Sequence, residues 1–395
     1  MSEEPRKDEL DPAAKAALTK KRRKAIAIAV AIFLILGLAF FLYWLIWWRF
    51  EETTDDAYVN GNQVMVMPQV QGIVTSILTD DTQFVCEGQM LISLDPHDFI
   101  VAFERAKGHL GQTVRDVSQL FATVGQLAAE LEVRKADLLR ASLDYEHRKN
   151  LVDSGSVSRE DFEHSETSLY AAYASLQAAE ENLLGAEVEV KGTTILTHPR
   201  VQMAKAQLKE AFLSLHRCTI YAPATGIATQ RSVQVGQSVT PGTPLLSIVP
   251  IDQMWIDANY REVQLKNLRI GQKVKINVDM YGRDIPFHGC IVGLNPGTGS
   301  VFSVLPPQNA TGNWIKIVQR LPVRISLDPD EIKKYPLFLG LSVETRTDTH
   351  ERSGARLPTL SVQKPFYSTC VFASELEGVD DVIEDIIEEN YYYEP

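Results

Sequence analysis

Two stretches of this sequence repeat each other: GIVTSILTDDTQFVCEGQMLISLDP at 72–96, and GIATQRSVQVGQSVTPGTPLLSIVP at 226–250. Each alternates apolar and polar residues between glycine-containing turns, which is typical of short strands. The glycines, which stand where a turn would need a positive φ, pair as Gly72 with Gly226 and Gly88 with Gly242. Every pair has the same offset of 154 residues. Self-similarity at a fixed offset indicates a duplicated unit.

Each half of this repeat, 63–96 or 217–250, has 34 residues, which are too few to bury an apolar face alone. Packed on each other, the two halves can form one β domain. The pair resembles the halves of a lipoyl or biotinyl carrier domain, in which a lysine at a hairpin tip receives the cofactor. Neither Leu78–Phe84 nor Thr229–Ser238 contains a lysine. The carrier function therefore lacks the amine that it requires.

The insertion between the halves, at 97–216, carries a heptad repeat. Apolar residues recur every seven positions, at Phe103, Leu110, Val117, Val124, Leu131, Leu138 and Tyr145, and again at Phe162, Leu169, Leu176, Leu183 and Val190. A second seam position holds Ala172, Ala179 and Ala186. Sustained heptads are typical of helices that supercoil on a partner. The alternative, a helical core inside a globular domain, fits the narrow alanine-rich seam less well.

A short polar loop, Asp153–Ser158, separates the two heptad stretches. Short loops join antiparallel neighbours, so the insertion is predicted to be one hairpin with arms of about 50 residues, or roughly 75 Å. In the second arm, Gly192–Pro199 breaks the pattern, and Val201 and Leu208 resume it in a shifted phase. We expect a kink or loop there, because proline cannot continue a helix interior.

Ala25–Trp48 is a run of 24 residues without a charge. It reaches about 36 Å as a helix, enough to cross a hydrocarbon core. A cleaved signal peptide would be shorter and would be followed by small residues at its cleavage site. Basic residues crowd just before the run, at Lys20, Lys21, Arg22, Arg23 and Lys24. The positive-inside rule therefore keeps residues 1–24 in the cytoplasm and places residues from 49 onward outside.

Residues 251–345 hold short apolar runs, such as Val274–Val278 and Val323–Leu327, separated by glycines. Several short strands with regular turns indicate a small barrel or sandwich. The predicted fold is multidomain: a cytoplasmic tail (1–24), one N-terminal transmembrane helix (25–48), a linker or start of the barrel (49–62), a split lipoyl-like β domain (63–96 and 217–250), a long α-helical coiled-coil hairpin inserted in it (97–216), a C-terminal β-barrel (251–345), and a C-terminal segment with an acidic tail (346–395).

The composition disfavours several kinds of chemistry. A net charge of −12 argues against nucleic-acid binding, which needs a basic surface. The 8 histidines form no HExxH motif or other metal-ligand spacing, and no phosphate-binding loop is present. We therefore expect no catalytic residue, metal or cofactor.

The four cysteines are dispersed and have no CxxC spacing. We expect them to be buried small apolar residues rather than disulfides; they are Cys86, Cys218, Cys290 and Cys370.

The membrane anchor, the split lipoyl repeat and the coiled-coil insertion together resemble the HlyD-type membrane fusion proteins, or periplasmic adaptors, and more closely their EmrA branch. Short stretches carry the closer resemblance, at Thr54–Val59, Asp252–Tyr260 and Gly297–Ser300. The longest is Pro307–Ile325, PQNATGNWIKIVQRLPVRI. The resemblance runs from about residue 54 to residue 345. It implies a barrel on the membrane side of the lipoyl unit, a non-enzymatic protein, and assembly into trimers or hexamers.

Related adaptors contact an outer-membrane channel through a hairpin-tip motif similar to Arg-x3-Leu-x6-Ser. Leu151 and Ser158 match its last two positions, while the arginine position falls on His147, with Arg148 one residue along. The candidate docking residues are therefore His147, Arg148, Leu151, Gly155 and Ser158. Ser158 also suits the N-cap of the second arm, and Leu151 suits a helix-terminal staple. For each residue, the docking role and the structural role are compatible.

The C-terminal tail places apolar residues at helical spacing with acids between them, at Val379, Val382, Ile383, Ile386 and Ile387. This pattern predicts an amphipathic helix. The helix either docks on its own domain or contacts a transporter as a helix in a groove.

The resemblance implies an adaptor of a tripartite multidrug efflux pump in the inner membrane, with the bulk of the chain periplasmic. Its partners would be an inner-membrane exporter, with the major-facilitator type favoured, an outer-membrane channel of the TolC type, other copies of itself and the lipid bilayer. The alternative is an adaptor of a type I secretion system driven by an ABC transporter. A biotin- or lipoate-carrying enzyme subunit is disfavoured by the missing lysine and by the membrane span.

The charge asymmetry around the span generates a prediction about topology. Alkaline phosphatase fused after residue 350 should be active, because the positive-inside rule places residue 350 outside the cytoplasm. A fluorescent protein that matures only in the cytoplasm should stay dark at the same position. The opposite pair of results would reverse the orientation.

Overall fold

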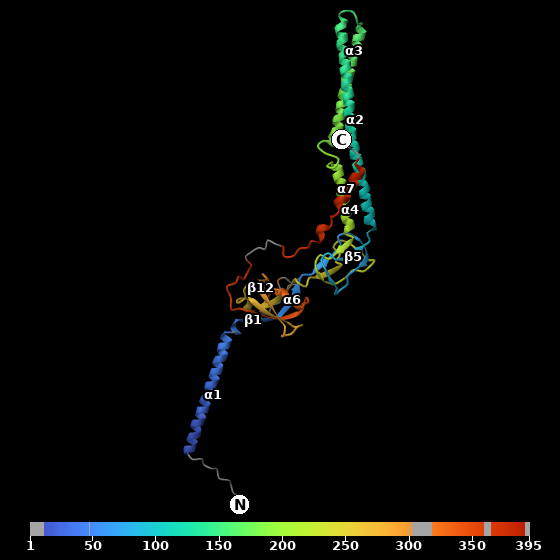
Figure 1. The fold of residues 1–395 in the computed structure, drawn as a ribbon. Coiled ribbons are helices and arrows are strands. Elements are labelled where there is room, and N and C mark those ends of the chain that lie inside the picture. Colours follow the sequence, from blue (N-terminus) through green and yellow to red (C-terminus); the bar gives the residue numbers. More distant parts are fainter. Residues whose placement is uncertain (1–11, 47, 300, 302–317, 359–364, 392–395) are drawn as a thin grey trace, which may run out of the picture. The chain divides into compact units, whose positions relative to one another are not determined.

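The computed structural model describes residues 12–46, 48–299, 301, 318–358 and 365–391 (Figure 1). The chain divides into two compact units. One consists of the chain up to Gln63 together with Val249–Phe366, and the other of Val64–Ile248 together with the chain from Tyr367 onward. Residues 302–317, which carry much of the longest family-like stretch, lie outside the described residues.

The first unit begins with a long apolar helix, α1 (Pro12–Ile46). Within it, Arg22–Leu45 is long and apolar enough to cross a membrane, which agrees with the predicted span. Its large apolar side chains face outward, with Phe33 80% and Ile35 66% exposed. Such a surface is stable only in contact with lipid or another apolar partner. A single turn of 3-10 helix, η1 (Trp48–Phe50), then leads into the first strand.

The rest of this unit is a closed six-stranded barrel with the strand order β1-β10-β13-β12-β11-β14. Its strands are β1 (Glu51–Gly61), β10 (Met254–Arg261), β11 (Lys273–Val278), β12 (Pro286–Leu294), β13 (Arg320–Leu327) and β14 (Ser342–Asp348). Two short helices lie between strands, α5 (Glu262–Leu265) and α6 (Pro329–Lys334). Alternate residues point inward, as in Met254–Arg261, where every second side chain is buried. Closure removes the free edges that an open sheet would expose.

The barrel core contains one large polar side chain whose hydroxyl is satisfied. Tyr260 is fully buried, and its hydroxyl lies 3.0 Å from Thr345 Oγ1 and 2.8 Å from Thr347 Oγ1. Burial raises the pKa of Tyr260, so the phenol remains protonated and can donate. A buried hydroxyl without a partner would cost about 1–3 kcal/mol, so the two threonines of β14 stabilise this packing.

The second unit contains two four-stranded sheets, and each mixes strands from both halves of the repeat. The first-half strands are β2 (Val64–Val66), β3 (Gly72–Ile77), β4 (Phe84–Val85) and β5 (Met90–Leu94). The second-half strands are β6 (Thr219–Tyr221), β7 (Gly226–Thr229), β8 (Ser238–Val239) and β9 (Leu246–Val249). The sheet orders are β2-β9-β7-β4 and β6-β5-β3-β8. Neither half has a complete sheet of its own, as the shortness of each half predicts.

The repeat extends to individual hydrogen bonds. The Leu78 amide donates to the Leu91 carbonyl at 2.8 Å, and 154 residues later the Ser232 amide donates to the Leu245 carbonyl at 2.9 Å. Gly88 and Gly242 have φ of +79° and +88°, the left-handed backbone that glycine adopts without a steric cost. The expectation of positive φ is wrong for Gly72 and Gly226, which open β3 and β7. Gly72 instead packs closely on Leu94, whose Cβ lies 3.3 Å from the position of an added Cβ.

A helical hairpin joins the two halves of the β domain. Its helices are α2 (His97–Val152), α3 (Arg159–Val190) and α4 (Pro199–His216). Helix α3 lies beside the part of α2 near the turn, and α4 lies beside the part near the β domain (Figure 1). With 56 residues, α2 is about 84 Å long. All the predicted heptad positions of both arms are buried or half-buried. The predicted coiled-coil hairpin is confirmed.

The predicted break in the second arm is also present, and a buried histidine closes it. His198, 4% exposed, is the N-cap of α4 and accepts a hydrogen bond from the Arg200 amide at Nδ1, at 3.2 Å. Its Nε2 lies 3.2 Å from the Glu189 carbonyl near the end of α3. Pro199 takes the first helical position, where its missing N–H costs nothing. One side chain thus connects the end of α3 to the start of α4.

The C-terminal tail packs on the base of this hairpin. After a 3-10 turn, η2 (Val371–Ser374), the chain forms α7 (Val379–Asn390), which lies against α2 and α4 (Figure 1). The predicted amphipathic face is buried in one apolar cluster, which includes Leu110, Val114, Val117, Val201, Leu208, Val379, Ile383, Ile386 and Ile387. Of the two interpretations drawn from the sequence, the structure shows docking on the chain's own domain.

Polar contacts fix the register of α7. The Asn390 side chain accepts a hydrogen bond from Arg115 Nε at 2.7 Å and donates to the Ile386 carbonyl at 2.7 Å. It lies over Gly111, where an added Cβ would approach its Cγ to 3.3 Å. Upstream of α7, Arg217 forms a 3.0 Å ion pair with Glu375. The tail is therefore attached to α2 through Asn390 and to the start of the second half-domain through Glu375.

Ile383, which is 4% exposed, provides a test of this packing. The change Ile383→Ala should destabilise the docked state of α7 by about 2–4 kcal/mol, because it leaves a cavity in a closed cluster. Amide hydrogen exchange across 379–390 should accelerate accordingly. The control Asp385→Ala, on the exposed face of the same helix, should leave exchange nearly unchanged. Equal exchange in both variants would mean that α7 is not held by this face.

Candidate docking site at the hairpin tip

The turn at the hairpin tip is closed by local hydrogen bonds. The Gly155 amide donates to the Val152 carbonyl at 3.1 Å, and Gly155 has φ of +71°. The Ser154 hydroxyl donates to the Leu151 carbonyl at 2.7 Å. A side chain with a Cβ would be strained at the left-handed position, so glycine permits the short reversal between the arms.

Ser158 begins the second arm as its N-cap, as the sequence predicts. Its hydroxyl oxygen accepts a hydrogen bond from the Asp161 amide at 3.0 Å, and its O–H donates to Asp161 Oδ2 at 2.6 Å. The hydroxyl of Ser158 is therefore already used twice within the hairpin. An N-cap of this kind contributes about 1 kcal/mol to helix stability, so a structural role for Ser158 accounts for its presence without a partner.

The arginine at the tip is also engaged within the hairpin. Arg148 Nη1 donates to the Asp161 carbonyl across the turn at 3.0 Å, and Nη2 lies 3.2 Å from Asp144 Oδ2. The prediction of Arg148 as a docking residue did not include these contacts, although the i,i+4 spacing from Asp144 indicates the ion pair. His147 and Leu151 remain exposed, with Leu151 45% exposed. Leu151 therefore does not serve as a buried staple.

An aromatic pair stabilises the tip from below. The rings of Tyr145 and Phe162, one from each arm, stack with centroids 5.4 Å apart, and Lys149 Nζ lies 5.9 Å from the Tyr145 ring centroid. Such pairs contribute about 0.5–1.5 kcal/mol beyond their burial. The exposed Leu151 thus lies on a turn whose geometry is fixed by its own cap, cross-turn hydrogen bond and stacked rings.

The predicted site residues fall into two separate groups. His147, Arg148, Leu151, Gly155 and Ser158 share the tip. The four lipoyl glycines belong to the β domain, which meets the hairpin where α2 begins at His97. The 56 residues of α2 separate the two groups, so they do not form one site.

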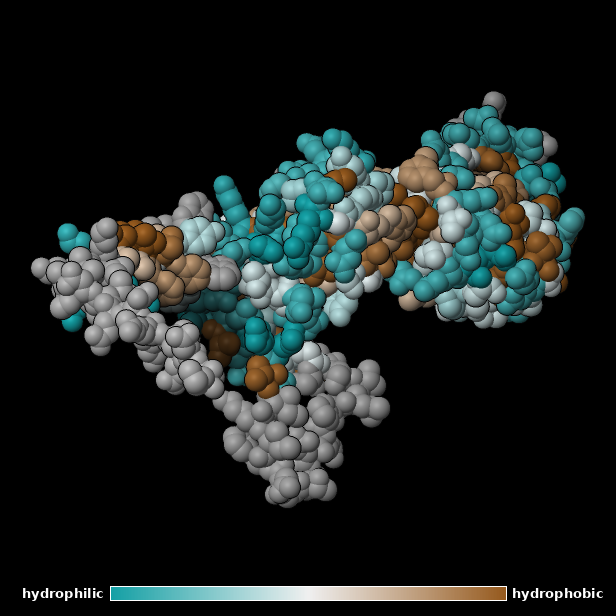
Figure 2. All heavy atoms as spheres, turned by 90° about the horizontal axis from the view of Figure 1, so that it is seen from below, coloured by the Kyte–Doolittle hydropathy of each residue, from teal (hydrophilic) through white to brown (hydrophobic). Residues whose placement is uncertain are grey.

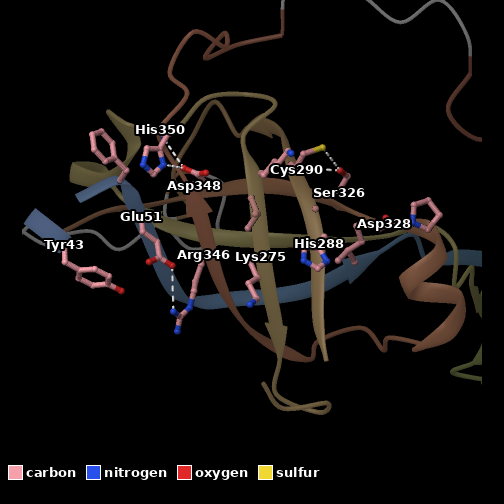
Figure 3. Close-up of a pocket in the computed structure, with 16 residues that line it drawn as sticks. Tyr43, Glu51, Lys275, His288, Cys290, Ser326, Asp328, Arg346, Asp348 and His350 are labelled. Carbon is pink, nitrogen blue, oxygen red and sulfur yellow. Dashed lines mark hydrogen bonds and ion pairs between the residues drawn. The ribbon is translucent and has the colours of Figure 1, made fainter. Parts of the chain in front are cut away.

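A separate open cavity of about 1010 Å³ lies on the outside of the barrel (Figure 3). Cys290 Sγ faces Ser326 Oγ at 3.1 Å, and His288 Nδ1 lies 2.7 Å from Glu331 Oε1. Glu51 forms a 3.8 Å ion pair with Arg346. These pairs link neighbouring strands or the following helix. Across the described parts of the chain, no group of three or more His, Cys, Asp or Glu residues is arranged to hold a metal ion.

The cysteines differ from the sequence expectation. Only Cys218 is buried, whereas Cys86, Cys290 and Cys370 are exposed, and all four are free thiols. The expectation that they are buried apolar residues is therefore wrong for three of them. Each of these three lies in a loop or points outward from a strand.

The architecture defines the class of protein. A membrane helix, a barrel, a β domain made of two interleaved half-repeats, and a helical hairpin inserted between the halves form the adaptor class known as membrane fusion proteins. The family model described as the EmrA alpha-helical hairpin domain matches residues 98–218.

The whole chain is similar to curated multidrug export proteins. It is 43% identical to the multidrug export protein EmrA of Escherichia coli (strain K12), over 88% of this chain and 90% of that protein. It is 40% identical to the multidrug export protein EmrA of Haemophilus influenzae, over 93% of this chain and 95% of that protein. The chain belongs to the EmrA family.

Solved structures that match this chain include the periplasmic adaptor protein EmrA. That chain is 19% identical, with a TM-score of 0.38, over 76% of this chain and 99% of the other. MacA from Actinobacillus actinomycetemcomitans is 19% identical, with a TM-score of 0.40, over 75% of this chain and 78% of the other.

The thiols give a chemical test of the second unit. Burial raises the pKa of Cys218 to about 11, so at neutral pH this thiol is both inaccessible and protonated. In the folded full chain, maleimide should label Cys86, Cys290 and Cys370, and should label Cys218 only after denaturation. Mass spectrometry of the labelled peptides gives the readout. Labelling of Cys218 at the same rate as the others would contradict its burial.

Proposed function

We propose that this protein is the adaptor of a tripartite multidrug efflux pump, linking an inner-membrane exporter of the major-facilitator type to an outer-membrane channel of the TolC type. The relatives at 43% and 40% identity, which span most of the chain, are multidrug export proteins. The observation that carries the proposal is the exposed apolar residue Leu151, held on a rigid turn at the far end of a helix of 56 residues.

The adaptor's work is mechanical. The membrane helix holds the N-terminal end of the chain, and the hairpin carries its tip about 84 Å from the β domain. A two-helix rod reaches that far only if it resists bending, and the heptad seam supplies continuous packing for this. The hydrogen-bonded capping of the tip keeps Leu151 exposed at low conformational cost, which favours docking over collapse.

Several copies of the chain act together in this proposal, as trimers or hexamers. Two helices are too thin to enclose a conduit. One face of α3 supports the assembly, because it exposes large apolar side chains at helical spacing; these are Tyr170 (69%), Tyr173 (60%), Leu184 (53%) and Val188 (65%). An apolar stripe along a surface helix is stable when a second helix covers it. A neighbouring hairpin of the same chain is the occupant that an assembly of adaptors provides.

The proposal also places residues from 49 onward on the outer side of the inner membrane. The single span and the basic residues before it support an N-terminus in the cytoplasm. Both β units and the hairpin would then lie in the periplasm, between the two membranes that the pump connects.

The change Leu151→Asp tests docking at the tip. It should remove an apolar contact worth about 1–3 kcal/mol from the interface with the channel, while an exposed helix end tolerates it with little loss of folding stability. The variant should fold, remain in the membrane and bind its exporter, yet fail to export. Drug accumulation in cells expressing the pump gives the measurement. Ser158 is a poor companion variant, because its loss would also remove the N-cap.

The matched control for this test is Ser168→Asp, which adds the same charge at an exposed position on α3, away from the turn. It should leave export at the parent level. Parent-level export by Leu151→Asp, with normal amounts of protein in the membrane, would show that the tip does not dock through this residue.

A further inference from the structure

The strand registers identify which end of the barrel faces the membrane helix. Strand β1 starts at Glu51, directly after η1, and Glu51 pairs with Asp348 at the end of β14. Next to it, β11 starts near Val274, which pairs with Thr347. Two segments therefore emerge at this end: residues 262–272, which connect β10 to β11, and residues 349–358, which follow β14. Figure 3 shows Glu51, Asp348 and His350 together at this end of the barrel.

Three arginines from these two segments converge there. Arg269 Nη1 donates to the Lys266 carbonyl at 3.0 Å, and Arg356 Nη2 donates to the same oxygen at 3.3 Å. Arg352 Nε donates to the Thr349 carbonyl at 3.0 Å. Local burial and the nearby charges of Arg356 and Arg352 lower the pKa of Arg269. We call Arg269, Arg352 and Arg356 the arginine cluster.

The backbone around the arginine cluster is fixed by the fold. The Ile270 amide donates to the Ala355 carbonyl at 3.0 Å, and Gln272 Nε2 donates to the Glu351 carbonyl at 2.7 Å. A side chain at Gly354 would clash with the Ile270 carbonyl, so the segment after β14 lies directly on the segment before β11. The two segments that carry the three arginines are therefore held against each other by the barrel.

No carboxylate neutralises the arginine cluster within the described chain: none of the ion pairs found there includes Arg269, Arg352 or Arg356. Acidic side chains at this end of the barrel have other partners, and Asp348, for example, pairs with His350. Glu52 Oε1 accepts from Asn267 at 2.8 Å, and Glu351 Oε1 accepts from Ser353 at 3.0 Å. Like charges brought together without a counter-charge repel one another, so an external anion would stabilise this arrangement.

The cluster also lies close to the membrane surface by chain connectivity. The Arg352 guanidinium is 5.7 Å from the ring centroid of Phe50, and Phe50 follows the end of the span, Leu45, by only five residues. Five residues reach at most about 18 Å. Exposed apolar side chains accompany the arginines, with Leu357 61% and Val263 68% exposed. In Figure 2 hydrophilic residues (teal) predominate in the middle of the view, where the barrel lies, with apolar residues (brown) among them.

We propose that the arginine cluster at the membrane end of the barrel binds the phosphate of anionic phospholipid headgroups, such as phosphatidylglycerol. Guanidinium groups bind phosphate oxygens through paired, charge-assisted hydrogen bonds. Arginines beside exposed apolar side chains suit the interface between headgroups and acyl chains. The contact fixes the barrel against the bilayer independently of any exporter, so it goes beyond the proposed pump function and does not require it.

Lipid retention by the purified full chain tests this proposal. The protein in neutral detergent is mixed with equal amounts of phosphatidylglycerol and phosphatidylcholine, and bound lipids are counted by native mass spectrometry. The variant Arg269→Gln/Arg352→Gln/Arg356→Gln should lose affinity for phosphatidylglycerol by about fivefold for each arginine removed, with phosphatidylcholine binding unchanged. The basic residues before α1 give a background that is the same in every variant, so the difference between variants is the measure.

The matched control removes three cations from the opposite end of the barrel, as Arg283→Gln/Lys333→Gln/Lys334→Gln. Arg283 lies in the β11–β12 connection, and Lys334 precedes Tyr335, whose ring contacts Tyr281 there. The control should keep the parent's preference for phosphatidylglycerol. Circular dichroism checks folding, and Arg356→Gln alone, at an exposed side chain with one 3.3 Å hydrogen bond, should give the same direction of change with minimal disturbance.

Three outcomes would overturn the proposal. The triple arginine variant could retain phosphatidylglycerol as the parent does. Inorganic phosphate at the lipid's concentration could displace the lipid completely, which would make this a site for free phosphate. The variant could keep its lipid but lose co-purification with an exporter, which would make the cluster a protein-docking surface.

Discussion

The interleaving of two half-repeats in one β domain constrains the rest of the second unit. In each sheet, two neighbouring central strands from one half lie between two outer strands from the other half, so neither half can bury its apolar face until the other is present. Strand β5 pairs with β6, with Ile92 opposite Ile220. This pairing brings together the two ends of the inserted segment, residues 97–216. The inserted chain must therefore leave the domain and return to the same place, and an antiparallel hairpin is the simplest form that does so.

The length of that hairpin creates a second requirement, which is met at its base. A rod that transmits position to its tip needs a firm attachment, and α2 alone would pivot on the short link from β5. The shifted return helix α4 and the C-terminal helix α7 add two more helices beside α2 at this point, around one buried apolar cluster. The Arg115–Asn390 and Arg217–Glu375 contacts fix the register of the tail. The acidic tail thereby becomes part of the mechanical base of the rod.

Polar groups in this protein mostly serve geometry. Ser158 and Arg148 hold the tip turn, His198 links α3 to α4, and Tyr260 satisfies its hydroxyl on two threonines inside the barrel. In each case a side chain with functional chemistry is occupied by backbone or by a neighbouring strand. The three arginines of the arginine cluster also donate to backbone carbonyls. They differ from Arg148 in their charge balance, because none of them forms an ion pair with a carboxylate among the residues that the structure describes. A cation that has no carboxylate partner in its own chain remains available to an external anion, whereas the paired Arg148 does not.

The sequence by itself determined the elements whose signals are periodic: the apolar run of α1, the heptad seam from Phe103 to Tyr145, the break before Pro199, and the duplicated β half-domain. Such patterns are local, so burial follows from spacing alone. Only the tertiary structure decided that α7 packs on α2 and α4, that Arg148 is bound across the turn, that Cys86, Cys290 and Cys370 are exposed, and that Gly72 and Gly226 lie in strands. Arg269 and Arg352 are 83 residues apart in the sequence, and they meet only because β11 and β14 are neighbours in a closed barrel. Contacts of this kind depend on strand register and on which surfaces remain uncovered. Neither can be inferred from the pattern of a single segment.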